Sequence, residues 1–244
     1  MPTLRAVDTD LWVAEQPLRY LGLEVGTRMT VVRLATGELA LISAIALDAS
    51  LQSQLDTLGT VRYIIAPNSF HYRFAADCRA RYPEAEFLAA PGLRAKKPEL
   101  AIDRELKTGE VIGEALECSA FAGVNVLTPN GIAALNEYIF FHRISRTLIL
   151  TDTAFYFDSS FPLLTQFAGR LLGSYQQLRP SILEKLASRE KEQIRAAVER
   201  AIAWDFQRVI VAHGNIVEQT AKQQFVAGYE WLLVPLRGVL NFEF

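Results

Sequence analysis

The sequence has 244 residues, of which 50% are hydrophobic and 21% charged, a composition typical of a globular protein with a sizeable core and not of a disordered chain. The formal net charge is −2 and no long run of Lys or Arg occurs, so nucleic acid is excluded as an expected partner. The first residues carry charges where a signal peptide needs an apolar core, and no apolar run reaches the roughly 18 residues of a transmembrane helix. Cys78 and Cys118 have no CxxC spacing, which favours two buried thiols in a reducing compartment. We therefore expect a cytoplasmic protein.

The first half of the chain predicts strands followed by helices. Residues 28–34 and 39–43 are rich in β-branched and aliphatic side chains and flank a turn, which predicts an antiparallel hairpin. Apolar residues at helical spacing then predict a helix that Gly59 ends. The elements expected around this hairpin are a strand at 11–14, that helix at 47–58, a strand at 62–66, a helix at 74–82, a strand at 86–90 and a solvated loop at 96–99.

The second half repeats this order. The elements expected are short strands within 106–113, 116–121 and 124–131, a hairpin of 137–142 with 147–150, helical segments through Leu172, over 180–186 and from an N-cap at Ser188, a helix capped by Asn215 that runs through Leu233, and an apolar tail at 236–244. Each half thus holds hairpin strands, a helix and a strand that ends in polar groups. This order predicts a mixed α/β (α+β) fold, a four-layer αββα sandwich. We expect a single domain over residues 1–244 with a helical insertion near 157–203.

Three apolar strands end on side chains that bind metals or protons. These ends are His71 after the strand at 62–66, Asp152 after the strand at 147–150, and His213 after the apolar residues 208–212. In open α/β sheets, ligands gather at the carboxyl ends of strands, because helices cover both faces of the sheet and leave that rim open. We therefore expect these three side chains to share a site, although a single His or Asp at a strand end is more often a cap. The third histidine, His142, is expected to be a turn or surface residue.

The order and spacing of these elements resemble the metallo-β-lactamase superfamily from about residue 10 to residue 220. The resemblance is carried by Leu41-Ile42-Ser43, where the family has Leu-Ile-Asp, by Thr151-Asp152, where it has Gly-Asp, and by Val211-Ala212-His213-Gly214, where it has a strand that ends in His. The resemblance implies a sandwich of the metallo-β-lactamase type.

The metal-binding loop of that family is not preserved. Laid without gaps on its His-x-His-x-Asp-His pattern, the sequence has Pro67 and Ser69 at the first two histidines, His71 at the aspartate and Tyr72 at the last histidine. The mid-chain histidine of the family, expected near residues 132–134, is also missing from the sequence. The resemblance therefore implies a metal-ligand-depleted branch, in which Asp152 and His213 keep ligand positions and His71 substitutes at a third.

Two classes of function remain open. The first is a relative with a degenerate metal site, non-catalytic or binding a small molecule. The second is a hydrolase of small ester or thioester substrates, with no cofactor or one divalent metal, zinc or iron, at His71, Asp152 and His213, where Asp152 and His213 are the candidate catalytic residues. The candidate substrate-binding residues are Asn68, Ser69, Tyr72 and Tyr156. Either class is compatible with a homo-oligomer.

The apolar segment at 161–172 follows the strand that carries Asp152. Its side chains suit the wall of a pocket for an apolar ligand or a self-association face. Packing into the core is the expectation that we adopt for them.

Overall fold

The larger of two sheets occupies the N-terminal half of the chain. In this computed structural model, which describes residues 2–233, the larger sheet has seven strands, in the spatial order β1 (Arg5–Asp8), β2 (Leu11–Gln16), β5 (Thr27–Arg33), β6 (Leu39–Ile42), β7 (Val61–Ala66), β8 (Glu86–Ala89) and β9 (Arg104–Glu105). Strands β1 to β6 pair antiparallel, and β6 to β9 pair parallel. The apolar tail expected at 236–244 lies outside the described residues.

The smaller sheet has five strands, in the order β10 (Val111–Ile112), β11 (Leu116–Phe121), β14 (Glu137–His142), β15 (Thr147–Ile149) and β16 (Arg208–Ile210). Its last pair, β15 and β16, is parallel, so the carboxyl ends of both strands lie at the same edge. Two small hairpins stand apart from the sheets, β3 (Arg19–Tyr20) with β4 (Leu23–Glu24) and β12 (Asn125–Thr128) with β13 (Gly131–Ala134).

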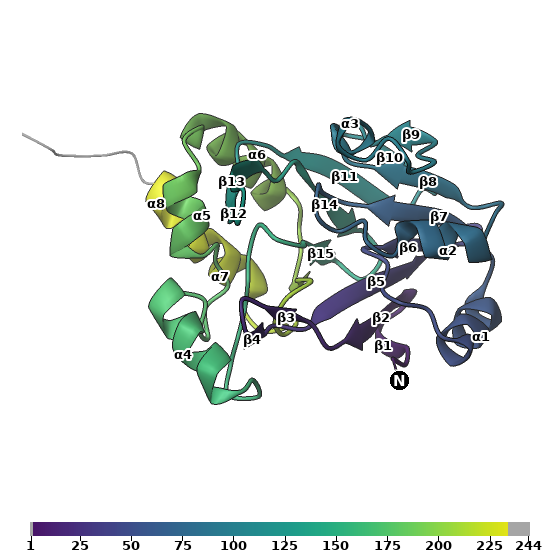
Figure 1. Ribbon diagram of the computed structural model, residues 1–244, viewed down its shortest axis with the longest axis horizontal. Coiled ribbons are helices and arrows are strands. Elements are labelled where there is room, and N and C mark those ends of the chain that lie inside the picture. The colour runs from purple at the N-terminus through teal and green to yellow at the C-terminus, as the bar shows by residue number, and fades with distance from the viewer. Residues whose placement is uncertain (1, 234–244) are drawn as a thin grey trace, which may run out of the picture.

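Helices cover the outer faces of both sheets (Figure 1). The helices on the larger sheet are α1 (Ala49–Leu58), α2 (Ala75–Arg81) and α3 (Leu93–Lys96), those on the smaller sheet are α6 (Lys191–Ala203), α7 (Ala221–Gly228) and α8 (Glu230–Leu233), and two more, α4 (Leu163–Leu172) and α5 (Ile182–Ala187), lie at one end. A central core of side chains from both sheets, including Ile65 and Phe140, separates the two outer cores. The molecule is therefore the four-layer αββα sandwich that the sequence predicts.

Helix α1 shows how local chemistry sets the bounds of an element. The side chain of Asp48 accepts a hydrogen bond from the backbone N–H of Leu51 at 2.8 Å, which satisfies a free donor of the first turn. Leu51 and Leu55 are fully buried against the larger sheet. The helix ends at Gly59, where a Cβ would lie 2.4 Å from the carbonyl oxygen of Gly37. Glycine is needed there because the two backbone segments touch.

Two helix starts differ from those the sequence predicts. Ser188 does not begin a helix: it ends α5, and its hydroxyl accepts the backbone N–H of Asn125 at 2.9 Å, while α6 begins at Lys191. Asn215 does not cap a helix either, since its side chain donates to the hydroxyl of Ser160 at 3.0 Å and α7 begins at Ala221. In both cases the polar side chain that could cap the helix is hydrogen-bonded instead to a residue distant in sequence.

His142 lies at the turn end of β14, as expected, but it is fully buried and is not a surface residue. Its Nδ1 atom is 2.7 Å from the hydroxyl of Ser145, and its Nε2 atom has no hydrogen-bond partner within residues 2–233. Burial lowers the pKa of His142 against the smaller opposing effect of Asp10 and Asp8. The imidazole is therefore held in its neutral form.

Helix α4 does not pack its apolar side chains into the core, so the expectation for residues 161–172 is wrong for the helical part. The side chains that α4 buries are those of Thr165 and Gln166, together with Gly169, and the ones that it exposes include Leu163 and Phe167. None of the helices formed by residues 2–233 is long and apolar enough to span a bilayer.

Candidate functional site

The structure brings together the three polar strand ends. His71 follows β7 of the larger sheet, and Asp152 and His213 follow the parallel strands β15 and β16 of the smaller sheet. One potential ligand atom from each of these residues lies within 4.8 Å of the other two. We refer to His71, Asp152 and His213 as the His-Asp-His group.

Both imidazoles turn the same ring nitrogen toward the carboxylate. The Nε2 atom of His71 is 3.1 Å from Oδ2 of Asp152, and that of His213 is 3.3 Å from Oδ1. The Nδ1 atom of His213 donates to the carbonyl oxygen of Gly26 at 2.6 Å, and a carbonyl can only accept, so this nitrogen carries a proton. The Nδ1 atom of His71 is 2.6 Å from the hydroxyl of Ser43. These outer contacts fix the orientation of both rings.

Asn68 holds the carboxylate of Asp152 in place. Its amide nitrogen donates to Oδ2 of Asp152 at 2.8 Å, and its amide oxygen accepts the backbone N–H groups of Phe70 and His71, each at 2.8 Å. One fully buried side chain therefore fixes both the acid and the backbone of the loop that carries the first histidine.

Glu137, the first residue of β14, is a site residue that the sequence analysis did not identify. It is 0% exposed, and each of its carboxylate oxygens accepts two hydrogen bonds. Oε1 accepts from the backbone N–H of Thr151 and the hydroxyl of Thr153, both at 2.8 Å, and Oε2 accepts from the backbone N–H of Asp152 at 2.7 Å and from Asn68 at 3.2 Å. The signal in the sequence was a carboxylate at the start of a strand whose next four residues are apolar.

Burial, neighbouring charges and hydrogen bonds together set the pKa values of this network. Burial disfavours the ionised form of Asp152, but the charges and hydrogen bonds of His71 and His213 outweigh it and hold the pKa of that carboxyl well below its usual range. Burial likewise disfavours protonated His71, but the charge of Asp152 prevails and raises the pKa of the imidazole. Burial and the charge of Asp152 raise the pKa of Glu137, against its hydrogen-bond donors. Protonated His71 and ionised Asp152 therefore stabilise each other as an ion pair.

Three of the predicted substrate-binding side chains lie outside this network. Ser69 is buried, and its carbonyl oxygen accepts the ammonium of Lys96 at 2.7 Å. The ring of Tyr72 lies 5.7 Å from that ammonium and packs on the core of the larger sheet, and Tyr156 packs on the core of the smaller sheet. Within residues 2–233, none of these three side chains forms a hydrogen bond with the His-Asp-His group.

A cavity of about 280 Å³ is lined by residues around Gly26 and by Ala212 and Gly214, the two neighbours of His213 in sequence. Its wall includes the buried guanidinium of Arg28, which donates to Glu15 at 2.9 Å, to the carbonyl oxygen of Gly214 at 2.8 Å and to that of Val211. Each of the three guanidinium nitrogens therefore has an acceptor within the protein, and the cavity has a paired and not a free cation in its wall.

The other positions at which the family resemblance implies a histidine ligand carry other residues in this chain. Pro67 and Ser69 offer no imidazole, and residues 131–134 form the hairpin strand β13. Among the described residues, the His-Asp-His group is the one cluster of three or more His, Cys, Asp or Glu side chains that is close enough to hold an ion. His71, Asp152 and His213 are therefore the described residues that could together hold a cation.

Comparison with solved structures finds metallo-β-lactamases over nearly the whole chain. The enzyme from Hirschia baltica is 12% identical with a TM-score of 0.64, covering 96% of this chain and 98% of that chain. The enzyme from Erythrobacter litoralis is 11% identical with a TM-score of 0.64, covering 94% and 96%. The metallo-β-lactamase FIM-1 from Pseudomonas aeruginosa, solved in its mono-zinc form, is 13% identical with a TM-score of 0.59, covering 96% and 97%. At such identities the similarity shows the fold, and the metallo-β-lactamase fold expected from the sequence is confirmed.

The sequence itself matches one family. The profile of a domain of unknown function, DUF4336, covers residues 8–177, which include His71 and Asp152 but not His213. No curated protein matches the sequence.

Proposed function

The chain belongs to the DUF4336 family, and we propose that it uses its metallo-β-lactamase fold to hold one divalent cation, zinc or iron, and to hydrolyse a small ester or thioester. The observation that carries this proposal is the geometry of the His-Asp-His group, in which two oriented imidazoles turn Nε2 toward one carboxylate. His71, Asp152 and His213 are the proposed ligands.

The donor set fits a single cation. A tetrahedral zinc ion with bonds of about 2.0–2.1 Å separates its ligand atoms by roughly 3.3 Å. Oδ1 of Asp152 lies 3.2 Å from Nε2 of His71 and 3.3 Å from Nε2 of His213. Three protein ligands leave a coordination position open for a substrate, and two His with one carboxylate is also a set that binds iron(II).

The protonation of His213 supports the same proposal. Because Nδ1 donates to a carbonyl, a neutral His213 presents the lone pair of Nε2 to a carboxylate oxygen 3.3 Å away. A lone pair and a carboxylate repel each other, so the site favours either a second proton or a cation between them. A bound cation would satisfy both groups.

The protein's own residues would orient and shield such a centre. When bound, a divalent cation supplies a Lewis acid and lowers the pKa of a water molecule that it coordinates. Ser43 and the carbonyl oxygen of Gly26 fix the imidazole rings, and Asn68 and Glu137 fix Asp152, as outer contacts do for metal ligands in general. The side chains of the His-Asp-His group are only 9–13% exposed, so the surrounding protein shields most of their surface from water.

Elemental analysis tests the proposal directly. The protein is purified without an affinity tag or chelator after expression with added zinc and iron, and near-stoichiometric metal is expected. His71→Ala, Asp152→Ala and His213→Ala should each lose it. The control is His142→Gln, which alters the remaining histidine at the opposite end of β14 and should keep the metal. Metal below about a tenth of an equivalent in the unaltered protein would contradict the proposal.

The second candidate is a non-catalytic protein that binds a small molecule at the His-Asp-His group. The observation that favours it is that His71 and Asp152 can satisfy each other as an ion pair at 3.1 Å without any cation. Under this alternative, Asp152→Ala lowers the melting temperature although there is no metal to lose, whereas a metal-binding site predicts that both losses occur together.

We also propose a cytoplasmic location. Its support is that Cys78 and Cys118 are free and buried, as the sequence predicts. Burial raises the pKa of both thiols to about 12, which keeps them protonated and unreactive.

A further inference from the structure

Helix α4 has an unusual distribution of side chains. It exposes Leu163 by 82%, Leu164 by 61%, Phe167 by 65% and Leu171 by 68%, while the residues that it buries are polar or small. A helix that packs on a core does the opposite. The apolar side of α4 is therefore available for a partner outside the described part of the chain.

Neighbouring elements extend this apolar face. The hairpin β3–β4 exposes Leu21 by 77%, and α5 exposes Leu186 by 75%. The hydroxyl of Thr165 in α4 donates to the carbonyl oxygen of Glu24 in β4 at 3.0 Å, and α5 contacts β12. Figure 1 shows α4, α5 and the two hairpins at one end of the molecule. We call the exposed apolar side chains of these four elements the apolar end.

Basic side chains outnumber acidic ones in the segment that holds α4 and α5, although the whole chain has a formal net charge of −2. Residues 159–189 contain four basic side chains and one acidic one. The acidic side chain, Glu184, is engaged by the hydroxyl and backbone N–H of Ser181 in the capping box of α5. The segment therefore has a local excess of basic side chains, with Asp158 and Glu190 directly at its two ends.

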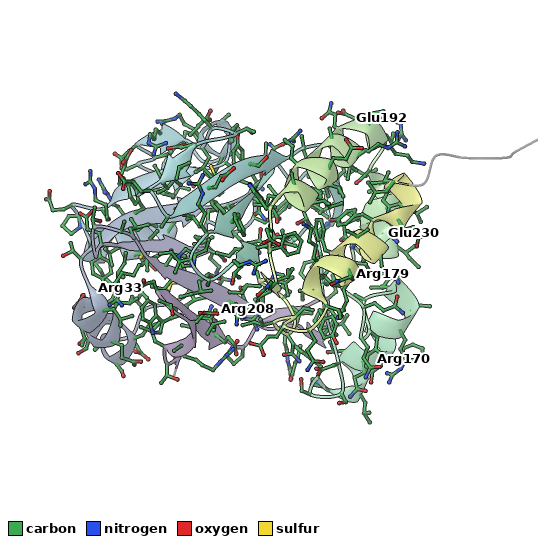
Figure 2. The ribbon with its side chains drawn as sticks, turned by 180° about the vertical axis from the view of Figure 1, so that it is seen from behind. Arg33, Arg170, Arg179, Glu192, Arg208 and Glu230 are labelled. Atoms are coloured by element: carbon green, nitrogen blue, oxygen red, sulfur yellow. The ribbon has the colours of Figure 1, made fainter. Side chains whose placement is uncertain are left out.

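Two of these cations border a cavity beside α4. Arg170 and Arg179 line a space of about 500 Å³, and the guanidinium of Arg170 lies 3.6 Å from the ring centre of Tyr175. Within residues 2–233 neither arginine forms a salt bridge, and Nε of Arg179 has no hydrogen-bond partner. Figure 2 shows both arginines on the side of the molecule that carries α4. Two unneutralised guanidinium groups beside a cavity favour an anionic ligand such as a phosphate group.

We propose that the apolar end docks on an anionic phospholipid membrane, with the exposed side chains of α4 at the acyl-chain boundary and Arg170 and Arg179 on lipid phosphates. A surface helix with an apolar face and adjacent basic residues is suited to this position. A second copy of the chain is a poorer occupant, because a two-fold contact through this face would bring the same cations together.

Docking in this way would turn the candidate site toward the membrane. The β3–β4 hairpin ends just before Gly26, which contacts His213, and the β12–β13 hairpin ends just before Glu137. Both hairpins therefore extend from the edge of the sandwich that carries the His-Asp-His group. Membrane docking of the apolar end requires no cation in that group.

Vesicle co-sedimentation of the full chain tests the proposal. The probes are vesicles of phosphatidylcholine and vesicles of phosphatidylcholine mixed with phosphatidylglycerol. We expect the protein to sediment with the mixed vesicles, to bind the neutral ones at least about tenfold more weakly, and to be released by salt. Leu163→Ser/Phe167→Ser and Arg170→Gln/Arg179→Gln should each lower the partition coefficient by about tenfold or more.

The controls alter the same residue types elsewhere on the surface. Ile144, 53% exposed in the turn after β14, is replaced by Ser, and exposed Arg62 of β7 is replaced by Gln. Both controls should bind like the unaltered protein. Failure of the unaltered protein to sediment with mixed vesicles, equal binding to neutral vesicles, or an equal loss in the controls would overturn the proposal. A dimer in light scattering that Leu163→Ser/Phe167→Ser dissociates, without vesicle binding, would instead make this face a contact between copies.

Discussion

Glu137→Gln is expected to lower the free energy of unfolding by about 3 kcal/mol, because a glutamine cannot accept the four hydrogen bonds that Glu137 accepts. Whichever way the amide turns, its NH₂ group faces two donors, either those of Thr151 and Thr153 or those of Asp152 and Asn68. Each hydrogen bond to a charged acceptor contributes about 1.5–3 kcal/mol, so two lost bonds cost roughly 3–6 kcal/mol. The substitution also removes a buried charge beside Asp152, which offsets part of the loss in the free energy of unfolding.

Urea unfolding at neutral pH, followed by circular dichroism, measures this effect. The matched control is Glu192→Gln, because that side chain is 80% exposed in an ion pair with Arg195, and its loss should change the free energy of unfolding by less than about 0.5 kcal/mol. If Glu137→Gln were as stable as the unaltered protein, Glu137 would not be an ionised acceptor, and its role in positioning Asp152 would have to be abandoned.

Three further predictions concern the remaining contacts. Ser43→Ala removes the hydroxyl beside His71 and should weaken zinc binding by about tenfold in competition with a chromogenic chelator. Unchanged affinity would show that this hydroxyl does not orient the ring. His142 has a lowered pKa in the folded state, so its contribution to stability is present above the unfolded value of 6.5 and is lost as the pH falls through the folded value. Urea unfolding between neutral and mildly acidic pH should show a steeper loss in the unaltered protein than in His142→Gln, and parallel curves would refute this. Leu51→Ala should cost about 3 kcal/mol in the same assay, and Leu186→Ala less than about 0.5 kcal/mol, because the first is fully buried and the second is exposed. Equal losses would contradict the placement of Leu186.

The fold and the convergence of the strand ends could be derived from local patterns. Runs such as residues 148–150 are apolar without interruption because β15 is buried on both sides, and each run ends where the chain reaches the open edge. The order of hairpin, helix and polar strand end then places His71, Asp152 and His213 at related edges of two sheets. Because β15 pairs parallel with β16, Asp152 and His213 then lie side by side.

The remainder depended on contacts between distant segments. Glu137 positions Asp152 because four hydrogen-bond donors from other segments surround its carboxylate. The sequence of β14 alone does not indicate where those donors lie. Helical spacing indicates that residues 161–172 have an apolar side, but it does not indicate which side of the helix faces the sheets. The expectation that these apolar side chains pack into the core was wrong for this reason. Ser188 has the residue type of an N-cap, but the backbone N–H of Asn125 competes for its hydroxyl. Such competition is decided only by tertiary packing.

The hydrogen bonds around Asp152 also cross-link the two sheets. Asn68 and Gly26 belong to segments of the larger sheet, whereas their partners Asp152 and His213 belong to the smaller one. Movement of one sheet relative to the other would break these hydrogen bonds and separate the residues of the His-Asp-His group. A ligand that binds only the assembled group therefore opposes separation of the sheets by its own binding free energy. Occupancy of the site and cohesion of the sandwich are thus a single coupled equilibrium, and a ligand bound at one edge would slow hydrogen exchange in the central core of both sheets.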